Sequence, residues 1–275
     1  MSKKEFDTVL IDADQLPYAI GARAAGEPLS YALATVKNSL DRIQKQCNAE
    51  NRELWIKGKG NFREEIAVAR GYKSHRKTEK PAHFEDIYQY LIEFQGANEA
   101  HGMEADDMLS VKLYTDHLGD TDNFVLSSQD KDLINTPGWH FNPRKPEYGV
   151  QYVSPEESFV HFWWQMLAGD SADNIPGLPN VTPRARAMYS LKAPRGVGAK
   201  GAWEIVHATE IQDLPSTIHS LYHEWFEHDN PEMTEDFRVE FVDNYFTEQA
   251  RLLWMIRELH PDGTPVHFDK AWYDL

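Results

Sequence analysis

Three carboxylates occur within four consecutive positions, at Glu104, Asp106 and Asp107. They follow Gly102 and precede an apolar run with helical spacing that starts at Met108. Like charges this close repel one another, and a bound cation neutralises them. Ligands that offer only oxygen favour Mg²⁺ or Mn²⁺ over zinc. The segment therefore predicts part of a site for a hard divalent ion.

Carboxylates also end three other short segments. Two of these, residues 9–11 and 124–126, are apolar and read as strands, and the third contains Gly169. One aspartate at such a place is commonly a helix cap or a turn residue, but four clusters in one chain favour a shared site. Ligand sites of open α/β sheets collect at the carboxyl ends of strands. The further candidate ligands are Asp12, with Asp14 ranked below it, Asp130, Asp132, Asp170 and Asp173.

The 275 residues, 41% of them hydrophobic, can fill one large domain or a domain with an appendage. We find no apolar run of membrane-spanning length and no signal peptide. Cys47 is the single cysteine, which excludes an internal disulfide and a zinc site built on cysteine pairs. The twelve histidines form neither an HExxH nor an HxH pattern, so most are interpreted as structural or surface residues. We expect a cytoplasmic setting, which is the host cytoplasm for a phage-encoded protein.

The net charge of −16 argues at first sight against nucleic acid, because phosphate binding needs a basic surface. The distribution of the charge points the other way. Residues 57–80 hold eight Lys and Arg against three Glu, and residues 174–203 hold five Lys and Arg and no acid. A solvated face is the simple alternative for each run. Two basic runs on either side of acidic clusters nevertheless favour phosphate binding.

Apolar spacing predicts alternating strands and helices, which is typical of a mainly parallel sheet covered by helices. The expected strands are residues 8–11, 53–56 and 123–126. The expected helices are residues 31–47, 61–69, 84–94, 104–114 and 155–167. From residue 201 onward the chain reads as helical, most clearly over 247–259.

A glycine-rich segment precedes one of these helices, with the sequence Gly196-Val197-Gly198-Ala199-Lys200. Glycine before a helix start lets backbone N–H groups approach a phosphate, which the helix N-terminus favours. The spacing differs from that of a P-loop, so no nucleotide site is predicted. Because the segment follows an acidic pair, we expect it to hold a DNA backbone beside a metal centre.

Taken in order, these segments resemble the motifs of the 5′-nuclease superfamily, which contains flap endonucleases, the 5′-nuclease domain of bacterial DNA polymerase I and phage 5′→3′ exonucleases. The resemblance covers roughly residues 12–206, and the compact length is most similar to the phage branch. The motifs that carry it are Asp12, Phe62-Arg63, Tyr72-Lys73-Ser74-His75-Arg76, Glu104-Ala105-Asp106-Asp107, Asp130-x-Asp132, Gly169-Asp170-x-x-Asp173-Asn174-Ile175-Pro176-Gly177 and the glycine-rich segment.

The resemblance implies a PIN-like α/β domain over residues 1–168, including a helical arch at about 57–100. It implies a helical DNA-binding region of the helix–hairpin–helix type, with C-terminal helices, over residues 169–275. The cofactors would be two Mg²⁺ ions, for which Mn²⁺ can substitute, and K⁺ at the glycine loop. The partner would be DNA with a 5′ end, as a duplex, a flap or an RNA primer on DNA, and no membrane.

The same resemblance assigns roles to individual residues. The inner metal ligands would be Asp12, Glu104, Asp106 and Asp107, with Asp130 and Asp132 toward a second ion and Asp170 and Asp173 acting partly through water. Lys73 and Arg76 of the arch would engage the scissile phosphate. The DNA contacts would be Arg63, Tyr72, Lys77, Gly196, Gly198 and Lys200, although packing within the arch is the favoured interpretation of Tyr72.

Two features depart from the family pattern. Many relatives carry another aspartate after the second strand, where residues 55–61 of this chain contain no acid. Relatives also have only a few residues between the two glycine-containing elements, where this chain inserts residues 178–195. The insertion could add a DNA contact or form a solvated loop.

We therefore expect a Mg²⁺-dependent nuclease that cuts DNA from or near 5′ ends by a two-metal mechanism. A PIN-type ribonuclease is the alternative among enzymes. A non-catalytic DNA-binding accessory protein of replication is the alternative outside them. The sequence does not distinguish exonuclease from flap endonuclease activity.

Overall fold

The structure is a computed structural model that describes residues 4–76, 79–192 and 196–275. By packing, the chain forms two compact units, each assembled from separated stretches of sequence. The sheet unit comprises Met1–Asn61, Lys77–Pro155 and Met255–Val266, and the helical unit comprises Phe62–Arg76, Glu156–Trp254 and His267–Leu275. The sequence-based boundary at residue 168 differs from this division, because residues 156–168 pack with the helical unit.

The described part of the sheet unit contains a six-stranded sheet with the order β3-β2-β1-β4-β5-β6. All neighbouring strands pair in parallel except β5 and β6, which are antiparallel. The predicted fold class, a mainly parallel sheet flanked by helices, is therefore confirmed. The strands are β1 (Phe6–Asp12), β2 (Ala49–Lys57), β3 (Asn98–Ala100), β4 (Phe124–Ser127), β5 (Gly138–Phe141) and β6 (Val150–Val153).

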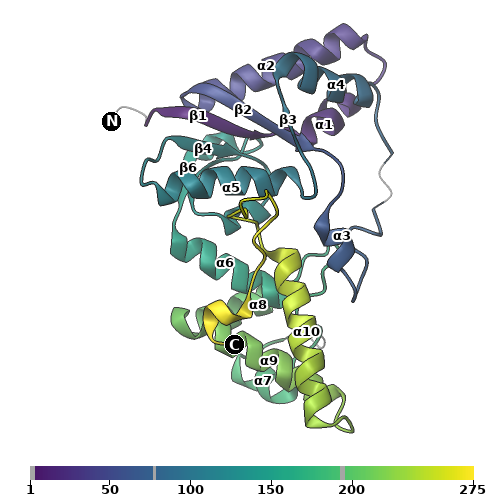
Figure 1. The fold of residues 1–275 in the computed structure, drawn as a ribbon, viewed down its shortest axis with the longest axis vertical. Helices are drawn as coiled ribbons and strands as arrows, with labels where there is room; N and C mark the ends of the chain where they lie inside the picture. The colour runs from purple at the N-terminus through teal and green to yellow at the C-terminus, as the bar shows by residue number, and fades with distance from the viewer. Residues whose placement is uncertain (1–3, 77–78, 193–195) are drawn as a thin grey trace. The chain divides into compact units, whose positions relative to one another are not determined.

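Helices cover both faces of this sheet, as Figure 1 shows. Helix α2 (Leu29–Cys47) lies on one face together with α1 (Gln15–Arg23) and α4 (Phe84–Gln95), and α5 (Ala105–Leu118) lies on the other. Because successive side chains of a strand point to opposite faces, β1 supplies both layers. A strand buried on both sides must be apolar almost throughout, which is why β1 could be recognised in the sequence.

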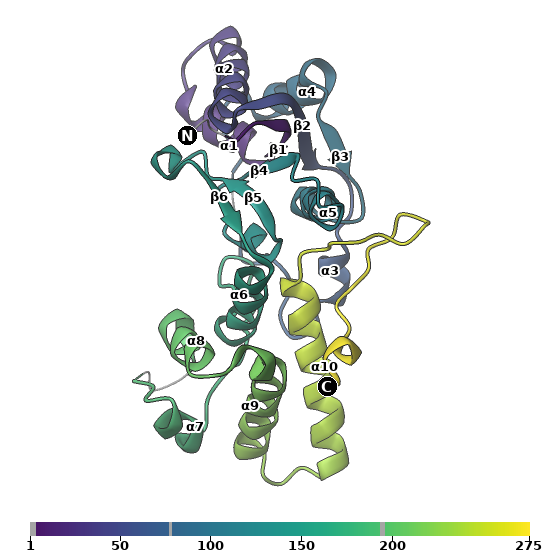
Figure 2. The same ribbon diagram turned by 90° about the vertical axis from the view of Figure 1, so that its left-hand side faces the viewer.

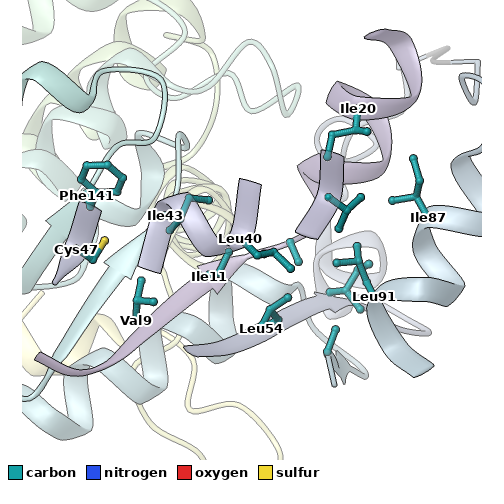
Figure 3. Close-up of a cluster of buried hydrophobic side chains, with 14 of the residues drawn as sticks. Val9, Ile11, Ile20, Leu40, Ile43, Cys47, Leu54, Ile87, Leu91 and Phe141 are labelled. Carbon is teal, nitrogen blue, oxygen red and sulfur yellow. The ribbon is translucent and has the colours of Figure 1, made fainter. Parts of the chain in front are cut away.

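The larger core lies between β1, β2 and α2. Leu40 of α2 packs with Val9 and Ile11 of β1 and with Leu54 of β2, all of them buried (Figure 3). On the opposite face, Leu10 of β1 joins Leu109 and Leu113 of α5 in a second cluster. Val9, Leu10 and Ile11 therefore fix the position of the strand end at Asp12 from both sides.

The strand order contains a topological switch point between β1 and β4. From β1 the chain adds β2 and β3 on one side, and it then adds β4, β5 and β6 on the other. In open α/β sheets of this order, the connections leave β1 and β4 in opposite directions and open a crevice at their carboxyl ends. Asp12 at the end of β1 and the acidic residues that follow β4 lie at this edge.

The helical unit packs around aromatic side chains. Trp163, Tyr222, Phe246 and Phe268 are buried, and Trp163 contacts both Phe246 and Phe268. Helices α9 and α10 lie side by side in both views (Figures 1 and 2). The helices of this unit are α3 (Phe62–Ile66), α6 (Pro155–Ala168, whose first residue is grouped with the sheet unit), α7 (Pro183–Met188), α8 (Gly198–His207), α9 (Leu214–Asp229) and α10 (Glu235–Leu253), with short 3-10 turns Ile211–Asp213 and Lys270–Tyr273.

The predicted helix over 247–259 is wrong at its carboxyl end. Helix α10 stops at Leu253, and Trp254 already has an extended backbone. Met255 joins the core cluster of Leu109 and Leu113 in the sheet unit. Apolar residues beyond Leu253 thus serve a different core, which periodicity cannot reveal. No helix in the described ranges is both long and apolar enough to cross a membrane.

Candidate metal centre

Asp12 is the last residue of β1 and is buried. Its carboxylate accepts hydrogen bonds from the Ser128 hydroxyl at 2.8 Å, from the Asp14 N–H at 3.2 Å and from the Gln15 amide at 3.3 Å. Ser128 directly follows β4, the parallel neighbour of β1. The hydrogen bond to Ser128 therefore joins the two strand ends at the switch point.

Asp130 is placed at the same edge by the turn that follows β4. Its N–H donates to the Ser128 hydroxyl at 2.9 Å, and its own carboxylate accepts the Asp132 N–H at 3.0 Å. Ser128 thus contacts Asp12 and the backbone of Asp130 at once. Asp132 begins a short 3-10 turn, and its carboxylate lies 3.8 Å from the Lys131 ammonium.

Helix α5 brings the third acidic segment to this region through its N-terminus. Glu104 is the N-cap and is buried, and its side chain accepts an N–H from the third helical residue. That residue, Asp107, accepts the Glu104 N–H at 3.1 Å in return. Such a capping box satisfies two otherwise unpaired donors and fixes the direction of the first helical turn. Asp106 lies on this first turn of α5.

Asp107 is the most deeply buried of the three carboxylates in this segment. Its side chain is fully buried, with one carboxylate oxygen on the Glu104 N–H and the other accepting the Ile256 N–H at 3.2 Å. Both oxygens thus bind backbone donors within the sheet unit. Asp107 therefore holds Glu104 and the residue 256 segment in place, and its role as an inner metal ligand stays a prediction.

The electrostatics show which carboxylates act on one another. Burial, followed by the charges of Asp14 and Asp130, raises the pKa of Asp12 to about 7. Burial also raises the pKa of Asp106 well above its usual range, and the charges that add to this effect are Asp12, Asp130, Glu104 and Asp14, in that order. Residues from β1, from the turn after β4 and from α5 therefore share one negative field.

The acids of this edge form an open group. In the described part of the chain, no three of their oxygens come within 4.8 Å of one another, a criterion that only His219, His223 and Asp243 meet. The edge does not present a closed three-carboxylate site for a single ion. A spread arrangement is compatible with a pair of ions, whose separation of about 3.5–4 Å requires ligands over a wider span.

Asp14 contributes more to this negative field than expected, because the sequence ranked it below Asp12 as a metal ligand. It is the strongest charge acting on Asp12, and its own carboxylate accepts the Lys57 N–H at 2.6 Å. Lys57 is the last residue of β2. Asp14 lies beyond the end of β1 and has a helical backbone as the N-cap of α1, so the turn after the strand, and not strand spacing, brings its carboxylate to the Lys57 N–H.

Asp170 and Asp173 lie in the helical unit, on the turn that follows α6. Asp170 is buried, and its carboxylate accepts the N–H groups of Ala172 at 2.7 Å and Asp173 at 3.3 Å. Close backbone approach shapes this turn, because a Cβ at Gly177 would lie 2.4 Å from the Gly169 nitrogen. The glycines of this motif are therefore required by packing, whatever else the turn binds.

The predicted basic residues of the arch are paired with Asp173. Arg76 contacts its carboxylate at 2.5 Å, Lys73 lies 3.5 Å away, and the Tyr72 hydroxyl donates to it at 2.7 Å. The Lys73 N–H also donates to the Asp173 carbonyl at 3.0 Å. Tyr72 is buried, so the favoured interpretation of packing describes it and a DNA-stacking role does not.

Arg63 was expected to contact DNA, and the structure corrects this expectation. Its side chain has 0% exposure, and its guanidinium donates to the carbonyls of Leu252 at 3.0 Å and Trp254 at 2.8 Å. These are carbonyls at the end of α10, which lack partners within the helix. Arg63 therefore caps α10 from inside the helical unit.

The glycine-rich segment enters helix α8. Gly196 and Gly198 have positive φ angles of 62° and 63°, and Gly198 is the first residue of α8. Lys200 lies exposed on the first turn. Positive φ is readily available only to glycine, so this backbone path needs these residue types. The predicted contact Lys77 lies outside the described residues.

A cavity of about 770 Å³ opens beside Asp130 in the sheet unit. Its walls come from the turn after β4 and from β5, β6 and their connection. Three cations line it together with an exposed tyrosine: Lys131, Arg144, Lys145 and Tyr148. Arg144 and Lys145 are a lone basic pair in the sequence and line a cavity only because the β5–β6 hairpin folds, so local sequence does not reveal this basic site.

Known proteins resemble this chain in fold more than in sequence. No protein-family model matches the sequence. DNA polymerase I of Rhizobium leguminosarum is 30% identical over 99 residues, a match that spans 33% of this chain and only 9% of that protein. A T5 5′-exonuclease with bound zinc ions aligns over 90% of this chain and 99% of its own, with 18% identity and a TM-score of 0.50. The chain has the fold of the T5 5′-exonuclease.

Two further solved structures are similar over comparable lengths. The D15 flap endonuclease of bacteriophage T5, in a complex with DNA and metal ions, covers 88% of this chain and 99% of its own at 17% identity and a TM-score of 0.46. The catalytic core of Rad2 with DNA substrate covers 97% of this chain and 83% of its own at 12% identity and a TM-score of 0.48.

Proposed function

We propose that this chain is a divalent-metal-dependent 5′ nuclease that hydrolyses phosphodiester bonds of DNA. The observation that supports this most strongly is that Asp12, Asp106 and Asp130 lie at the switch-point edge of the sheet, where the charges of Asp12 and Asp130 raise the pKa of Asp106 and the charge of Asp130 raises the pKa of Asp12. A shared negative field at this position is unfavourable without a cation. The fold, which is that of a 5′-exonuclease, agrees with the assignment.

The donor set fits a hard ion. Asp12, Glu104, Asp106 and Asp130 offer only carboxylate oxygens, which suit Mg²⁺ or Mn²⁺. We assign the inner sites of two ions to these residues, with Asp132, Asp170 and Asp173 as outer or water-mediated ligands. Bound ions of this kind activate a water molecule and stabilise the charge that develops on the phosphate and on the leaving oxygen.

The protein's own hydrogen bonds hold these carboxylates in register. Ser128 fixes Asp12 and the turn of Asp130, and Asp107 fixes the Glu104 cap. Neither Ser128 nor Asp107 needs to touch the substrate. Each positions a neighbour, which is the usual way in which a preorganised site is supported.

Substrate binding would draw on the basic groups of each unit. In the sheet unit, Lys131, Arg144 and Lys145 give the cavity beside Asp130 the charge to hold a DNA strand. In the helical unit, the backbone N–H groups at Gly196 and Gly198 and the Lys200 ammonium suit a phosphate, and the same loop is our proposed K⁺ site. Lys73 and Arg76 would serve the scissile phosphate once they leave Asp173.

Cleavage of 5′-labelled DNA, as a duplex and as a flap, tests the proposal. We expect Mg²⁺-dependent release of short products that EDTA abolishes and that Asp12→Asn reduces by more than about a hundredfold, because the ions lose a central ligand. The matched control is Asp7→Asn, an exposed residue at the opposite end of the same strand, which should cleave as the wild type does. Full activity in EDTA would contradict the proposal.

The same assay separates the alternatives. Preference for a single-stranded RNA of the same sequence would identify a ribonuclease. Tight DNA binding without cleavage in Mg²⁺ or Mn²⁺ would identify an accessory protein. Product sizes from the flap would show whether exonuclease or flap endonuclease activity dominates.

A further inference from the structure

A second group of potential metal ligands lies in the helical unit, within α9 and α10. His219 and His223 are four residues apart on α9, so their side chains share one face of that helix. Asp243 lies on α10, which runs beside α9 (Figure 2). Asp243 follows His223 by twenty positions in the sequence, so the three residues form no recognised local motif.

The three side chains converge on one oxygen. The Nε2 atom of His219 lies 3.1 Å from Oδ1 of Asp243, and Nε2 of His223 lies 3.7 Å from the same oxygen. One ligand atom from each residue lies within 4.8 Å of the other two. Bonds of about 2.0–2.1 Å to a tetrahedral Zn²⁺ place its ligands about 3.3 Å apart, so these distances bracket the separation that the ion requires.

The surroundings hold the ligands in this arrangement. The His219 ring packs edge-on against Phe246 at 4.9 Å and lies 4.6 Å from the His223 ring. Lys270 pairs with Oδ2 of Asp243, the carboxylate oxygen that does not face the imidazoles. Ligating carboxylates usually have such an outer partner, which fixes the orientation of the inner oxygen.

We propose that His219, His223 and Asp243 bind one transition-metal dication, with Zn²⁺ as the preferred ion. Two imidazoles and one carboxylate are ligands that Zn²⁺ accepts in tetrahedral sites, with water in the fourth position. The half-exposed side chains leave room for that water. The ion would tie α9 to α10 and stabilise the helical unit, and this inference does not depend on the proposed nuclease activity.

Titration of untagged full-length protein with Co²⁺ tests the inference. Tetrahedral Co²⁺ absorbs visible light much more strongly than the octahedral ion, so an intense band rising to one equivalent is the expected result. Zn²⁺ should displace the band and raise the thermal unfolding midpoint. His223→Gln should weaken Co²⁺ binding by more than about tenfold, since changes in outer partners alone cost that much.

Two variants keep the test specific. His228→Gln removes an exposed histidine from the end of the same helix and should leave the band unchanged. Asp12→Asn removes a carboxylate of the sheet unit and should also leave it unchanged. No intense band, or a band that survives in folded His223→Gln protein, would overturn the inference and leave the cluster as an ion-pair network around Asp243.

Discussion

At the scale of single residues, the carboxylates at the acidic edge of the sheet repel one another, and a bound cation would reduce this repulsion. Asp12 is buried, accepts three hydrogen bonds and still has a pKa raised to about 7. Burial and like charges outweigh the hydrogen bonds that favour its ionised form. A residue that only stabilised the fold would be better replaced by a neutral one. The choice of aspartate here therefore points to function.

The raised pKa of Asp12 gives a prediction with a definite sign. Its protonated form stabilises the metal-free protein below the ordinary aspartate pKa, and this contribution is lost as the pH rises through about 7. At pH 8 without metal, Asp12→Asn should therefore be more stable than the wild type by roughly 2–4 kcal/mol. Urea unfolding in EDTA measures this difference. Added Mg²⁺ should stabilise the wild type and not the variant.

Asp7→Asn is the matched control for that experiment and should change the unfolding free energy little at any pH. A variant Asp12→Asn that is less stable than the wild type in EDTA at pH 8 would contradict the proposed repulsion. An equal increase in unfolding free energy on adding Mg²⁺ to the wild type and to Asp12→Asn would contradict it as well.

Arg63 is buried and stabilises the carboxyl end of α10. Arg63→Met should destabilise the protein by about 2–4 kcal/mol, because the carbonyls of Leu252 and Trp254 lose their donors in a buried site. Arg70→Met, an exposed change in the same segment, should cost little. Guanidinium unfolding measures both. If Arg63→Met keeps wild-type stability but loses affinity for DNA, the corrected assignment is wrong.

At the scale of elements, the turn after α6 and the segment 71–76 form one structure within the helical unit. Besides the contacts to Asp173, the Asn174 amide donates to the Gly71 carbonyl at 3.0 Å, and Arg76 donates to the Ala172 carbonyl at 2.9 Å. Asp173 is thus the centre of a network that holds the predicted arch residues. Lys73 and Arg76 must leave Asp173 before they can contact a DNA phosphate as proposed.

Removing the charge of Asp173 should loosen this segment. In Asp173→Asn, trypsin should cut after Lys73 or Arg76 about five- to thirtyfold faster, which corresponds to a loss of about 1–2 kcal/mol in local stability. Mass spectrometry of the first fragments identifies the sites. Asp236→Asn, an exposed change at the start of α10, is the control. Equal cleavage rates in the two variants would show that Asp173 does not restrain the segment.

The hairpin of β5 and β6 carries the basic cavity, and Arg144 tests its use. Arg144→Ala should weaken DNA binding and lower the slope of log affinity against log salt by about one, because one phosphate contact is lost. Arg23→Ala removes an exposed cation at the end of α1 and should do neither. Fluorescence anisotropy in Ca²⁺ at several salt concentrations measures both slopes. An unchanged slope in Arg144→Ala would remove the cavity from the DNA path.

The elements also show what the sequence could predict. Strands β1 and β4 were recognised because burial on both faces makes them apolar, and the helices α2, α4 and α6 because their apolar residues repeat with helical spacing. Strand β4 is equally short but opens on three consecutive apolar residues, whereas strands β3, β5 and β6 have only three or four residues with polar ones among them, so they show neither an apolar run nor a period. Arg63 was misassigned for another reason. Burial of a charged residue depends on tertiary packing that local sequence does not encode.

At the scale of the whole molecule, the chain crosses between its two units several times, so neither unit is a continuous stretch of sequence. The candidate ligands divide accordingly. Asp12, Glu104, Asp106 and Asp130 belong to the sheet unit, and Asp170 and Asp173 belong to the helical unit. The net charge of −16 likewise hides local basic regions, as the cavity with Lys131, Arg144 and Lys145 shows.

We propose that carboxylates from β1, α5 and the turn after β4 bind hard divalent ions at the switch point of the sheet. Diffraction from crystals grown with Mn²⁺, measured at the manganese absorption edge, tests it most directly. We predict anomalous peaks within bonding distance of the carboxylate oxygens of Asp12 and Asp130, and their loss in Asp12→Asn. Well-ordered Asp12 and Asp130 side chains without any peak between them, at a saturating Mn²⁺ concentration, would contradict the account.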